Sequence, residues 1–388
     1  MKSLRRKAFP MTRWLRQTFE LSHGDHRAIL PMEGVRGFAV FLVFLVHYVT
    51  LALPWVDPAS ATHVAASAIE TMGHLGVDLF FVLSGYLIYG MLIAKPRPIG
   101  RYAARRVQRI YPTFAAVFVM YLLLSAVFAG ESKIPNGLAG LAYVLQNALL
   151  LPGIFDIKPM ITVAWSLSYE AFAYVAIPLL IGVLSMRSMK RWRRVICLLS
   201  LSGAVFVLTA GGLGHLRLTM FLCGMLVFEA IDAGALRGLR RWALPALAIA
   251  LGVTIAMPWL GLPVWGLFVL LFVLFFVFCC GCLIEGGRSA SLFTLAPLRW
   301  LGNMSYSYYL IHGLSLKAMF LVLAKLYPAQ AQASTAFWLA LPIAFLATLG
   351  PSILLFIMVE KPYSLSKRPR REQADRPVKG GVMPGSQV

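Results

Sequence analysis

Seven ionisable side chains interrupt the long apolar runs of this 388-residue sequence. They are Arg36, His47, Asp78, Glu170, Glu229, His312 and Lys317. Ionisable groups inside apolar segments of membrane length are energetically costly and are usually retained for a function. These residues are therefore the first candidates for chemistry, and the apolar runs around them decide where they lie.

Four of these residues fall at one depth when a rise of about 1.5 Å per helical residue is counted from the ends of the runs. His47 and His312 lie about 20 Å from the cytosolic ends of their helices, and Asp78 and Glu170 lie at about the same level. A neutral imidazole beside a carboxylate is what a general base near neutral pH requires. We therefore expect a buried cluster with His47 as the base. The alternative is that each histidine is a hydrogen-bonded core residue.

A second feature is the distance between Arg36 and His47, which are eleven residues apart and so share one helix face about 16 Å apart. This separation fits a ligand with an anionic head and a long thin arm, and coenzyme A thioesters have that shape. Arg101, Arg105 and Arg109 form a basic stripe that could bind either nucleotide phosphates or lipid phosphates. The alternative for Arg36 is that its side chain merely extends to the membrane interface.

The composition excludes a water-soluble globular protein. Hydrophobic residues make up 59% of the chain and charged residues only 13%, whereas soluble domains carry about 25% charged residues. The mean hydropathy is +0.76. The net charge of +21 does not indicate a nucleic-acid partner, because the basic residues lie in short gaps between apolar runs. The five cysteines lack metal-ligand spacing, so neither a metal site nor a disulfide is expected.

Ten apolar runs are long enough to cross about 30 Å of hydrocarbon. They cover residues 33–54, 71–94, 110–129, 163–185, 195–212, 215–233, 242–258, 262–284, 299–325 and 334–359. The basic gaps between them fall on one side of the membrane, and positive charge stays on the cytoplasmic side. The sequence therefore predicts an all-α integral membrane protein with ten transmembrane helices and both termini in the cytoplasm.

Three regions follow from this arrangement. Residues 1–30 are expected to form a cytosolic N-terminal arm, with Trp14, Leu15 and Phe19 on the membrane surface. Residues 31–364 would form the membrane domain, and residues 365–388 a basic tail that is predicted to be disordered.

The longest outward loop contains the apolar stretch 138–151. This stretch is too short to cross a membrane. We expect it to be re-entrant or interfacial, and we expect the loop that contains it, at about 130–162, to form a lid over a site that faces outward.

The motifs around these residues resemble those of the type-3 membrane acyltransferase family, which includes bacterial polysaccharide O-acetyltransferases. Six motifs occur in order between Leu30 and Glu360. They are LPMEGVRGFAVFLVFLVHY (30–48), GVDLFFVLSGYLI (76–88), RRVQRIYP (105–112), WSLSYEAFAY (165–174), LGNMSYSYYLIH (301–312) and EKP (360–362). Met32 and Glu33 stand where the family more usually has Leu and Asp, and Phe-Ala-Tyr at 172–174 stands where Phe-Tyr is common.

The resemblance implies that an acyl group, usually acetyl, passes from cytosolic acyl-coenzyme A to a hydroxyl of an extracytoplasmic sugar. His47 would match the essential histidine, either as a general base or as a covalent carrier of the acyl group. Glu170 or Asp78 would orient its ring. We assign the other site residues to the two substrates: to acyl-coenzyme A belong Arg36, Arg105, Arg109 and Ser84, and to the acceptor belong His312, Trp165 and Tyr306.

The expected setting is the bacterial inner membrane, with membrane lipids and a carbohydrate acceptor as partners. Many members of the family carry an extra extracytoplasmic hydrolase-like domain, which does not follow the last run here. The chain is therefore expected to act with its membrane part alone, as a homodimer or with a separate extracytoplasmic partner.

The main alternative function is a proton-coupled transporter or flippase that uses the same histidines and carboxylates as a proton relay. The sequence shows neither a repeat of its two halves nor a matched pair of broken helices, which disfavours a transporter. A structural membrane scaffold would leave the shared depth of the buried charges unexplained.

Overall fold

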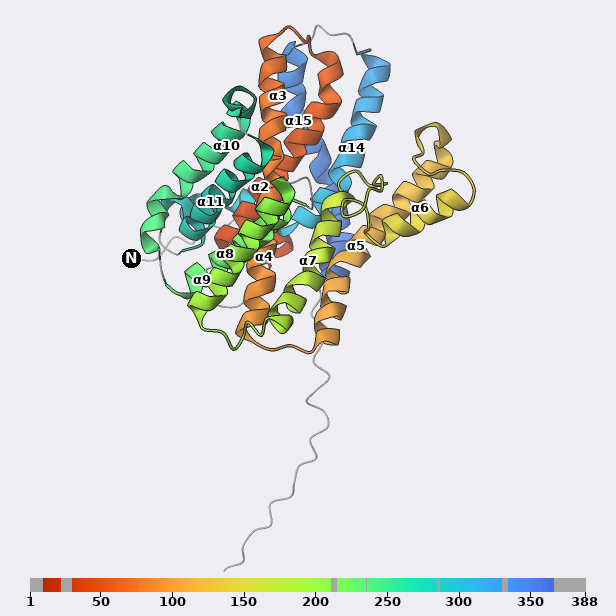
Figure 1. Ribbon diagram of the computed structural model, residues 1–388. Coiled ribbons are helices and arrows are strands. Elements are labelled where there is room, and N and C mark those ends of the chain that lie inside the picture. Colours follow the sequence, from red (N-terminus) through yellow and green to blue (C-terminus); the bar gives the residue numbers. More distant parts are fainter. Residues whose placement is uncertain are drawn as a thin grey trace, which may run out of the picture.

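The computed structural model describes residues 10–21, 30–210, 215–234, 236–261, 263–284, 287–329 and 334–365. These residues are predominantly helical and include no β-strand, so the predicted all-α fold is confirmed (Figure 1). The α-helices are α1 (Pro10–Phe19), α2 (Leu30–Ala52), α3 (Ala61–Gly73), α4 (Leu75–Ala94), α5 (Ile99–Val127), α6 (Leu138–Ala148), α7 (Ala164–Val183), α8 (Arg191–Ala210), α9 (Leu218–Asp232), α10 (Ala243–Leu260), α11 (Val264–Leu283), α12 (Arg288–Phe293), α13 (Ala296–Asn303), α14 (Ser305–Leu326) and α15 (Ser334–Leu355). Short helical turns join them at η2 (Leu53–Trp55), η3 (Ala129–Glu131) and η4 (Arg237–Trp242), and the π-helical segment η5 (Phe356–Ser364) continues α15.

Nine helical segments in the described ranges are long and apolar enough to cross a membrane. Nine of the ten predicted spans are thus present. Most begin and end within about six residues of the expected bounds, but the segments Ala61–Ala94 and Ile99–Val127 begin about ten residues earlier than predicted. The tenth, expected at 215–233, is α9, which has only 15 residues and rises about 22 Å. Most of its side chains are buried by the surrounding helices, so it is shielded by protein along much of its length.

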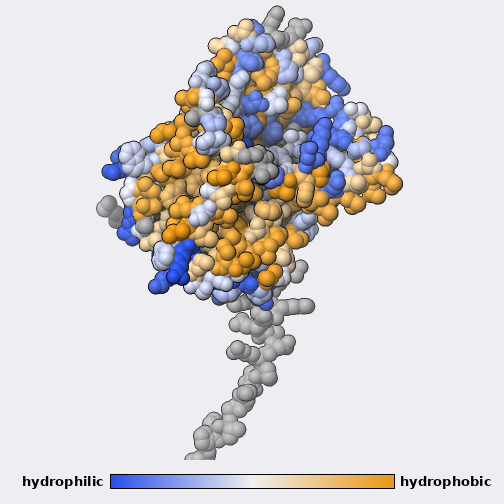
Figure 2. Space-filling model, viewed as in Figure 1, coloured by the Kyte–Doolittle hydropathy of each residue, from blue (hydrophilic) through white to orange (hydrophobic). Residues whose placement is uncertain are grey.

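The outer surface of the bundle is strongly apolar. Figure 2 shows hydrophobic residues over a broad area of one face, from the region of α8–α11 across to α7. Exposed side chains such as Val175, Leu179 and Val207 contribute to this kind of surface. Within each helix the backbone groups are hydrogen-bonded internally, which a lipid environment requires. The molecule is a multi-pass membrane protein.

Helix α2 runs through the middle of the molecule and packs against α4, α13, α14 and α3. Its lower part touches α12 and α13 backbone to backbone. A Cβ atom on Gly34 would lie 1.8 Å from the carbonyl oxygen of Phe293, and one on Gly302 would lie 1.8 Å from the carbonyl oxygen of Glu33. Only glycine permits this approach at either position. The ion pair between Arg299 and Glu33, at 2.9 Å, adds a second link between α13 and α2.

The described part of the N-terminal arm folds onto the body of the protein. Phe19 is 2% exposed and stacks on Phe356 with ring centroids 5.5 Å apart. The predicted position of Phe19 on the membrane surface is therefore wrong, because η5 offers an apolar partner that the sequence pattern of the arm alone does not reveal. The predicted disordered tail lies outside the described residues except for Leu365.

The apolar stretch within the loop predicted to be a lid forms α6, which lies to the side of the bundle beyond α5 (Figure 1). No residue of α6 lines either of the two pockets described below. A later part of the same loop, residues 160–163, does line one of them. Its contribution to a site therefore comes from this short segment and not from α6.

Candidate active site

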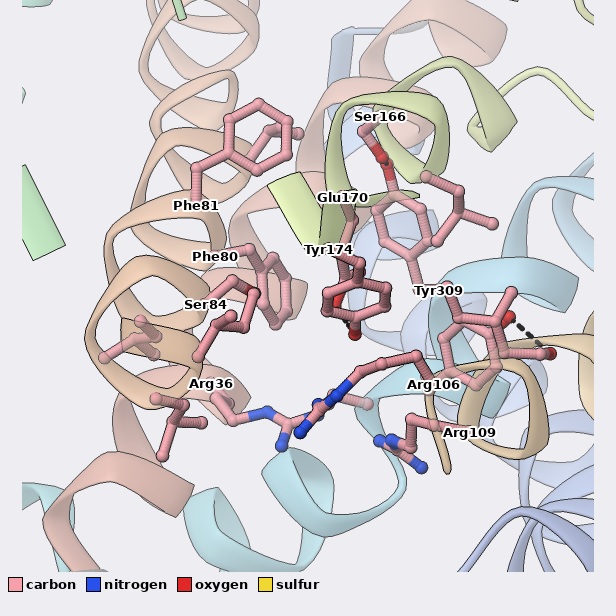
Figure 3. Close-up of a pocket in the computed structure, with 18 residues that line it drawn as sticks. Arg36, Phe80, Phe81, Ser84, Arg106, Arg109, Ser166, Glu170, Tyr174 and Tyr309 are labelled. Atoms are coloured by element: carbon pink, nitrogen blue, oxygen red, sulfur yellow. Dashed lines mark hydrogen bonds between the residues drawn. The ribbon is translucent and has the colours of Figure 1, made fainter. Parts of the chain in front are cut away.

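A first pocket, which we call the arginine pocket, lies between α2, α4, α5, α7 and α14 and encloses about 160 Å³. Three guanidinium groups, those of Arg36, Arg106 and Arg109, gather on one side of it (Figure 3). The acidic and hydroxyl groups that face the same space are Ser84, Ser166, Glu170, Tyr174, Ser305, Tyr306 and Tyr309. The pocket is thus narrow, polar and rich in positive charge.

The three arginines differ in their partners. Arg109 lies 2.7 Å from a carboxylate oxygen of the fully buried Glu360, so its charge is compensated within the protein. Arg36 donates to the Ser305 hydroxyl at 3.0 Å. Arg106 packs over the rings of Tyr102 and Tyr174 and donates to the sulfur of Met91. Within the described part of the chain, Arg36 and Arg106 make no salt bridge, so these two cations are the ones available to an anionic ligand.

The carboxylate of Glu170 accepts a hydrogen bond from the Tyr174 hydroxyl at 2.5 Å. Both residues lie on α7, one helical turn apart, and both line the arginine pocket. Figure 3 shows them between the arginines and the end of the pocket where Ser166 lies. Glu170 is therefore placed to influence a ligand in the arginine pocket.

A second pocket, which we call the histidine pocket, encloses about 620 Å³. His47 and Thr50 of α2 line it, together with residues of α5, α14 and the segment 160–163. Its other walls are mainly apolar, including Leu124, Phe128, Met160, Ile161, Leu310, Leu314 and Leu321. The space beside His47 is thus wide and has few polar groups.

The polar rim of the histidine pocket is formed by residues that follow α5 and by α14. Lys317 makes an ion pair with Glu131 at 2.5 Å, and both side chains are about half exposed. The hydrogen bond and the positive charge of Lys317 lower the pKa of the Glu131 carboxyl. Lys133 also lines the pocket, and it donates to the carbonyl oxygens of Pro159 and Met160.

The two pockets meet at Tyr309. Its hydroxyl is 2.6 Å from the Ser166 hydroxyl and donates to the Val163 carbonyl oxygen at 3.1 Å. Ser166 and Tyr309 line the arginine pocket. Val163 and Leu310, the neighbour of Tyr309, line the histidine pocket. The hydrogen-bonded Tyr309 and Ser166 thus stand at the boundary between the two spaces.

Of the four residues expected at one depth, the structure brings two together. The rings of His47 and His312 lie with their centroids 5.1 Å apart. Within the described residues, neither Asp78 nor Glu170 forms a hydrogen bond to His47. Residues at a common depth can still point in different directions from their helices. For this reason the two carboxylates do not join the two histidines in one cluster. A catalytic role of the two carboxylates stays a prediction.

Asp78 and Trp165 belong to a separate cluster around Arg217. Asp78 is 2% exposed and pairs with Arg217 at 2.7 Å. The guanidinium of Arg217 also lies over the ring of Trp165, 5.3 Å from its centroid. None of these three residues lines either pocket. Arg217 precedes the short helix α9, and the hydropathy pattern of that span gave no reason to pair it with Asp78.

Two further expected positions differ from the structure. Arg105 is exposed and does not line the arginine pocket, whereas its neighbour Arg106 does. The predicted stripe took arginines at a spacing of four residues and therefore left out Arg106. Arg106 lies on the same helix face as Arg109 because the two are three residues apart. Tyr306, expected beside the acceptor, lines the arginine pocket and donates to the Ile110 carbonyl oxygen at 2.9 Å.

Within the described ranges, no group of three His, Cys, Asp or Glu side chains occurs that could hold a metal ion. The five cysteines are free thiols, four of them buried. The polar groups that line the two pockets belong to arginine, lysine, histidine, hydroxyl-bearing and carboxylate side chains.

Comparison with known proteins identifies the family of the chain. The family model described as an acyltransferase domain matches residues 30–357. O-acetyltransferase OatA of Staphylococcus aureus is 26% identical over 211 residues, which cover 51% of this chain and 31% of that protein. "Putative peptidoglycan O-acetyltransferase YrhL" of Bacillus subtilis is 29% identical over 199 residues, which cover 47% of this chain and 28% of that protein.

The matched region spans about a third of the length of these two relatives. No solved structure matches the chain. The family model, however, covers more than four fifths of the sequence, including Arg36, His47 and His312. The chain therefore belongs to the type-3 membrane acyltransferase family.

Proposed function

We propose that this protein is a membrane O-acyltransferase that moves an acetyl group from acetyl-coenzyme A to a hydroxyl of a glycan outside the cytoplasm. The observation that carries the proposal is that one helix, α2, presents Arg36 to the arginine pocket and His47 to the histidine pocket. Membership of the family supports acyl transfer. The names of the two relatives support an acetyl group and a glycan acceptor.

The donor would enter the arginine pocket. Arg36 and Arg106 have no carboxylate partner in the described residues and would bind phosphate oxygens of coenzyme A. The pocket volume of about 160 Å³ is below the roughly 300–1,000 Å³ of pockets that enclose whole drug-sized ligands. The narrow space would therefore take the thin acyl-bearing arm, with the nucleotide outside it.

The acceptor would occupy the wider histidine pocket. There His47 would remove the proton of the acceptor hydroxyl while the oxygen attacks the thioester carbonyl. A carbon–oxygen bond forms and the carbon–sulfur bond breaks. The sulfur leaves as a thiolate and takes the proton from His47, which releases coenzyme A as the thiol and returns the imidazole to its neutral form.

The proposed reaction would take place at the boundary between the two pockets. The thioester must reach the hydroxyl near Tyr309 and Ser166, which are hydrogen-bonded to each other at 2.6 Å. Parting these two side chains would join the two spaces. Glu170 lies on the donor side of this boundary, where its carboxylate would orient the approaching arm and not the ring of His47.

We also propose that the arginine pocket opens to the cytoplasm of a bacterium and that both termini lie on that side of the inner membrane. The connections α4–α5 and α7–α8 lie at the lower edge of Figure 1. They carry many of the basic residues, including Lys95, Arg97 and Lys190, and positive charge is retained on the cytoplasmic side. A cysteine introduced at position 97 should react with an impermeant maleimide only after the cells are opened.

Replacing His47 tests the proposed reaction. Purified full-length His47→Ala, in lipid nanodiscs with radiolabelled acetyl-coenzyme A and glycan fragments, should lose at least about 100-fold in kcat, because a positioned base contributes roughly 10²–10⁴-fold. His63→Ala is the matched control, since His63 lies on α3 and lines neither pocket. Normal transfer by His47→Ala would disprove the proposal. Acetyl label on the wild-type protein would replace the direct step with a covalent one.

A further inference from the structure

His312 lies at the centre of the molecule, in the last motif of the sequence pattern. Its side chain is 0% exposed. The ring stacks on Tyr308 of the same helix, with centroids 5.4 Å apart. The ring of His47 lies at 5.1 Å and that of Tyr309 at 6.2 Å, measured between centroids. His312 does not line the histidine pocket, whereas His47 does. A ligand in that pocket would thus touch His47 and would have His312 behind it.

The hydrogen bonds of His312 define its tautomer. Nδ1 is 2.9 Å from the carbonyl oxygen of Tyr308. A carbonyl oxygen can only accept, so Nδ1 must carry the hydrogen. No carboxylate contacts the ring in the described residues, and an imidazolium there would be a buried charge without a partner. The ring is therefore neutral, and its other nitrogen, Nε2, presents a lone pair.

That lone pair has no partner. Nε2 of His312 is buried and makes no hydrogen bond to any described residue. The polar side chains around it on α14 are all satisfied: Ser307 bonds Glu360, Tyr308 bonds Thr348 and Tyr309 bonds Ser166. Buried polar atoms are nearly always paired, and an exception calls for an explanation. The nearest ring with an N–H to offer is that of His47.

We propose that Nε2 of His312 accepts the ring N–H of His47 that faces away from the acceptor, and that His312 is the positioning residue for the base. The inference rests on the proposed function. When His47 takes the proton of the acceptor hydroxyl, both of its ring nitrogens carry hydrogen, and His312 accepts from one of them. The proton stays on His47 until the thiolate takes it, so His312 begins and ends neutral.

A neutral His312 beside His47 has a physical advantage over the carboxylate that the sequence predicted beside His47. A carboxylate beside a buried imidazole would be a second charge in an apolar setting, where isolated charges are costly. A neutral imidazole fixes the ring of His47 and stabilises the imidazolium by a hydrogen bond alone. The hydrogen bond from Nδ1 to Tyr308 would hold the ring of His312 in the orientation that this contact with His47 requires.

Two substitutions of similar polarity but different length test the proposal. In His312→Gln the amide oxygen can occupy the place of Nε2, whereas in His312→Asn it reaches only the place of Nδ1. We expect His312→Gln to keep kcat within about 10-fold of wild type, and His312→Asn and His312→Leu to lose at least about 100-fold. The KM for acetyl-coenzyme A should change less than about twofold, because none of the changes touches the arginine pocket.

The control is a second histidine with a similar hydrogen bond. His215 contacts the Tyr169 hydroxyl at 2.7 Å and lines neither pocket, so His215→Gln and His215→Leu should both keep kcat near wild type. Equal activity of His312→Gln and His312→Asn, or normal kcat in His312→Leu, would overturn the proposal. If instead His47→Ala retained transfer, the proposed function itself would be wrong.

A spectroscopic measurement tests the tautomer without relying on activity. In full-length protein labelled with 15N-histidine, a long-range proton–nitrogen correlation spectrum distinguishes protonated from unprotonated ring nitrogens. The His312 signals, identified by their loss in His312→Gln, should show hydrogen on Nδ1 and none on Nε2 at neutral pH. Hydrogen on Nε2 would contradict the proposal.

Discussion

The arginine pocket and the histidine pocket adjoin each other but differ in volume and in the polarity of their walls. The arginine pocket encloses about 160 Å³ and contains three guanidinium groups, one carboxylate and several hydroxyls. The histidine pocket encloses about 620 Å³ and is mainly apolar around His47. The arginine pocket would select its ligand by charge and small width, whereas the histidine pocket would select its ligand by size and shape. The difference explains why the donor can be argued from individual residues and the acceptor only as a class.

Among the changes that compare ligand binding in the two pockets, the largest effect is expected in the arginine pocket. Arg36→Ala should lower kcat/KM for acetyl-coenzyme A by roughly 10- to 100-fold, because hydrogen bonds to charged groups contribute about 1.5–3 kcal/mol each. Steady-state kinetics with varied donor measures this loss, and the KM for the acceptor should stay constant.

Arg105→Ala is the control for Arg36→Ala. Arg105 lies in the same basic segment as Arg106 but is exposed outside the pocket, so its removal should leave donor kinetics at the wild-type level. A large donor effect from Arg105→Ala would show that binding depends on the whole stripe and not on the pocket.

A smaller effect is expected when the histidine pocket is partly filled. Gly313 lines it, and a Cβ atom at this position would meet no other atom within 4 Å. Gly313→Leu should therefore fold and raise the KM for a bulky glycan acceptor by about 10-fold, the range expected for a few displaced contacts. Slow hydrolysis of acetyl-coenzyme A in the absence of acceptor measures whether the donor side is intact.

Gly182→Leu gives the matched control, because a Cβ atom at Gly182 on α7 also meets open space but lies outside both pockets. Unchanged acceptor kinetics in Gly313→Leu would mean that the acceptor does not occupy the histidine pocket. Loss of donor hydrolysis as well would mean that the two pockets are not separate in function.

The smallest effect is expected at the rim of the histidine pocket. At neutral pH Glu131 is ionised, since Lys317 lowers the pKa of its carboxyl, and it neutralises Lys317. Glu131→Gln leaves that cation unpaired and should lower the KM of an anionic acceptor such as nitrophenyl glucuronide about twofold relative to nitrophenyl glucoside, since exposed pairs are weak. High salt should abolish the difference. An equal change for both acceptors would place the carboxylate of the glucuronide away from this rim.

The helical fold and most of its boundaries could be predicted from the sequence, because a run of apolar residues of membrane length has few other stable conformations. Helix α9 is the exception in length, since hydropathy does not distinguish a full span from a shorter helix that is buried by its neighbours. Phe19 is another, because its partner Phe356 lies more than 300 residues away in the chain.

The candidate site could be predicted only in part. The spacing of Arg36 and His47 on one helix was informative, since both residues do face pockets. Buried acids were harder to interpret. Asp78 pairs with Arg217 and Glu229 pairs with Arg194, so these carboxylates have arginine partners from distant segments. A buried charged residue in the sequence therefore predicts that a partner is present. Only the packing of the helices shows which residue that partner is.

The close contact of α2 with α12 and α13 has a consequence for how an acyl group would travel. Because the backbones touch at Gly34 and Gly302, the helix that carries Arg36 and His47 has little room to slide along these two neighbours. Arg36 and His47 would then keep a fixed separation, and the long arm of the proposed donor would have to cover the distance between them. If only side chains such as Tyr309 turn aside, turnover would be set by the reach of the substrate and not by a rocking motion of the helices.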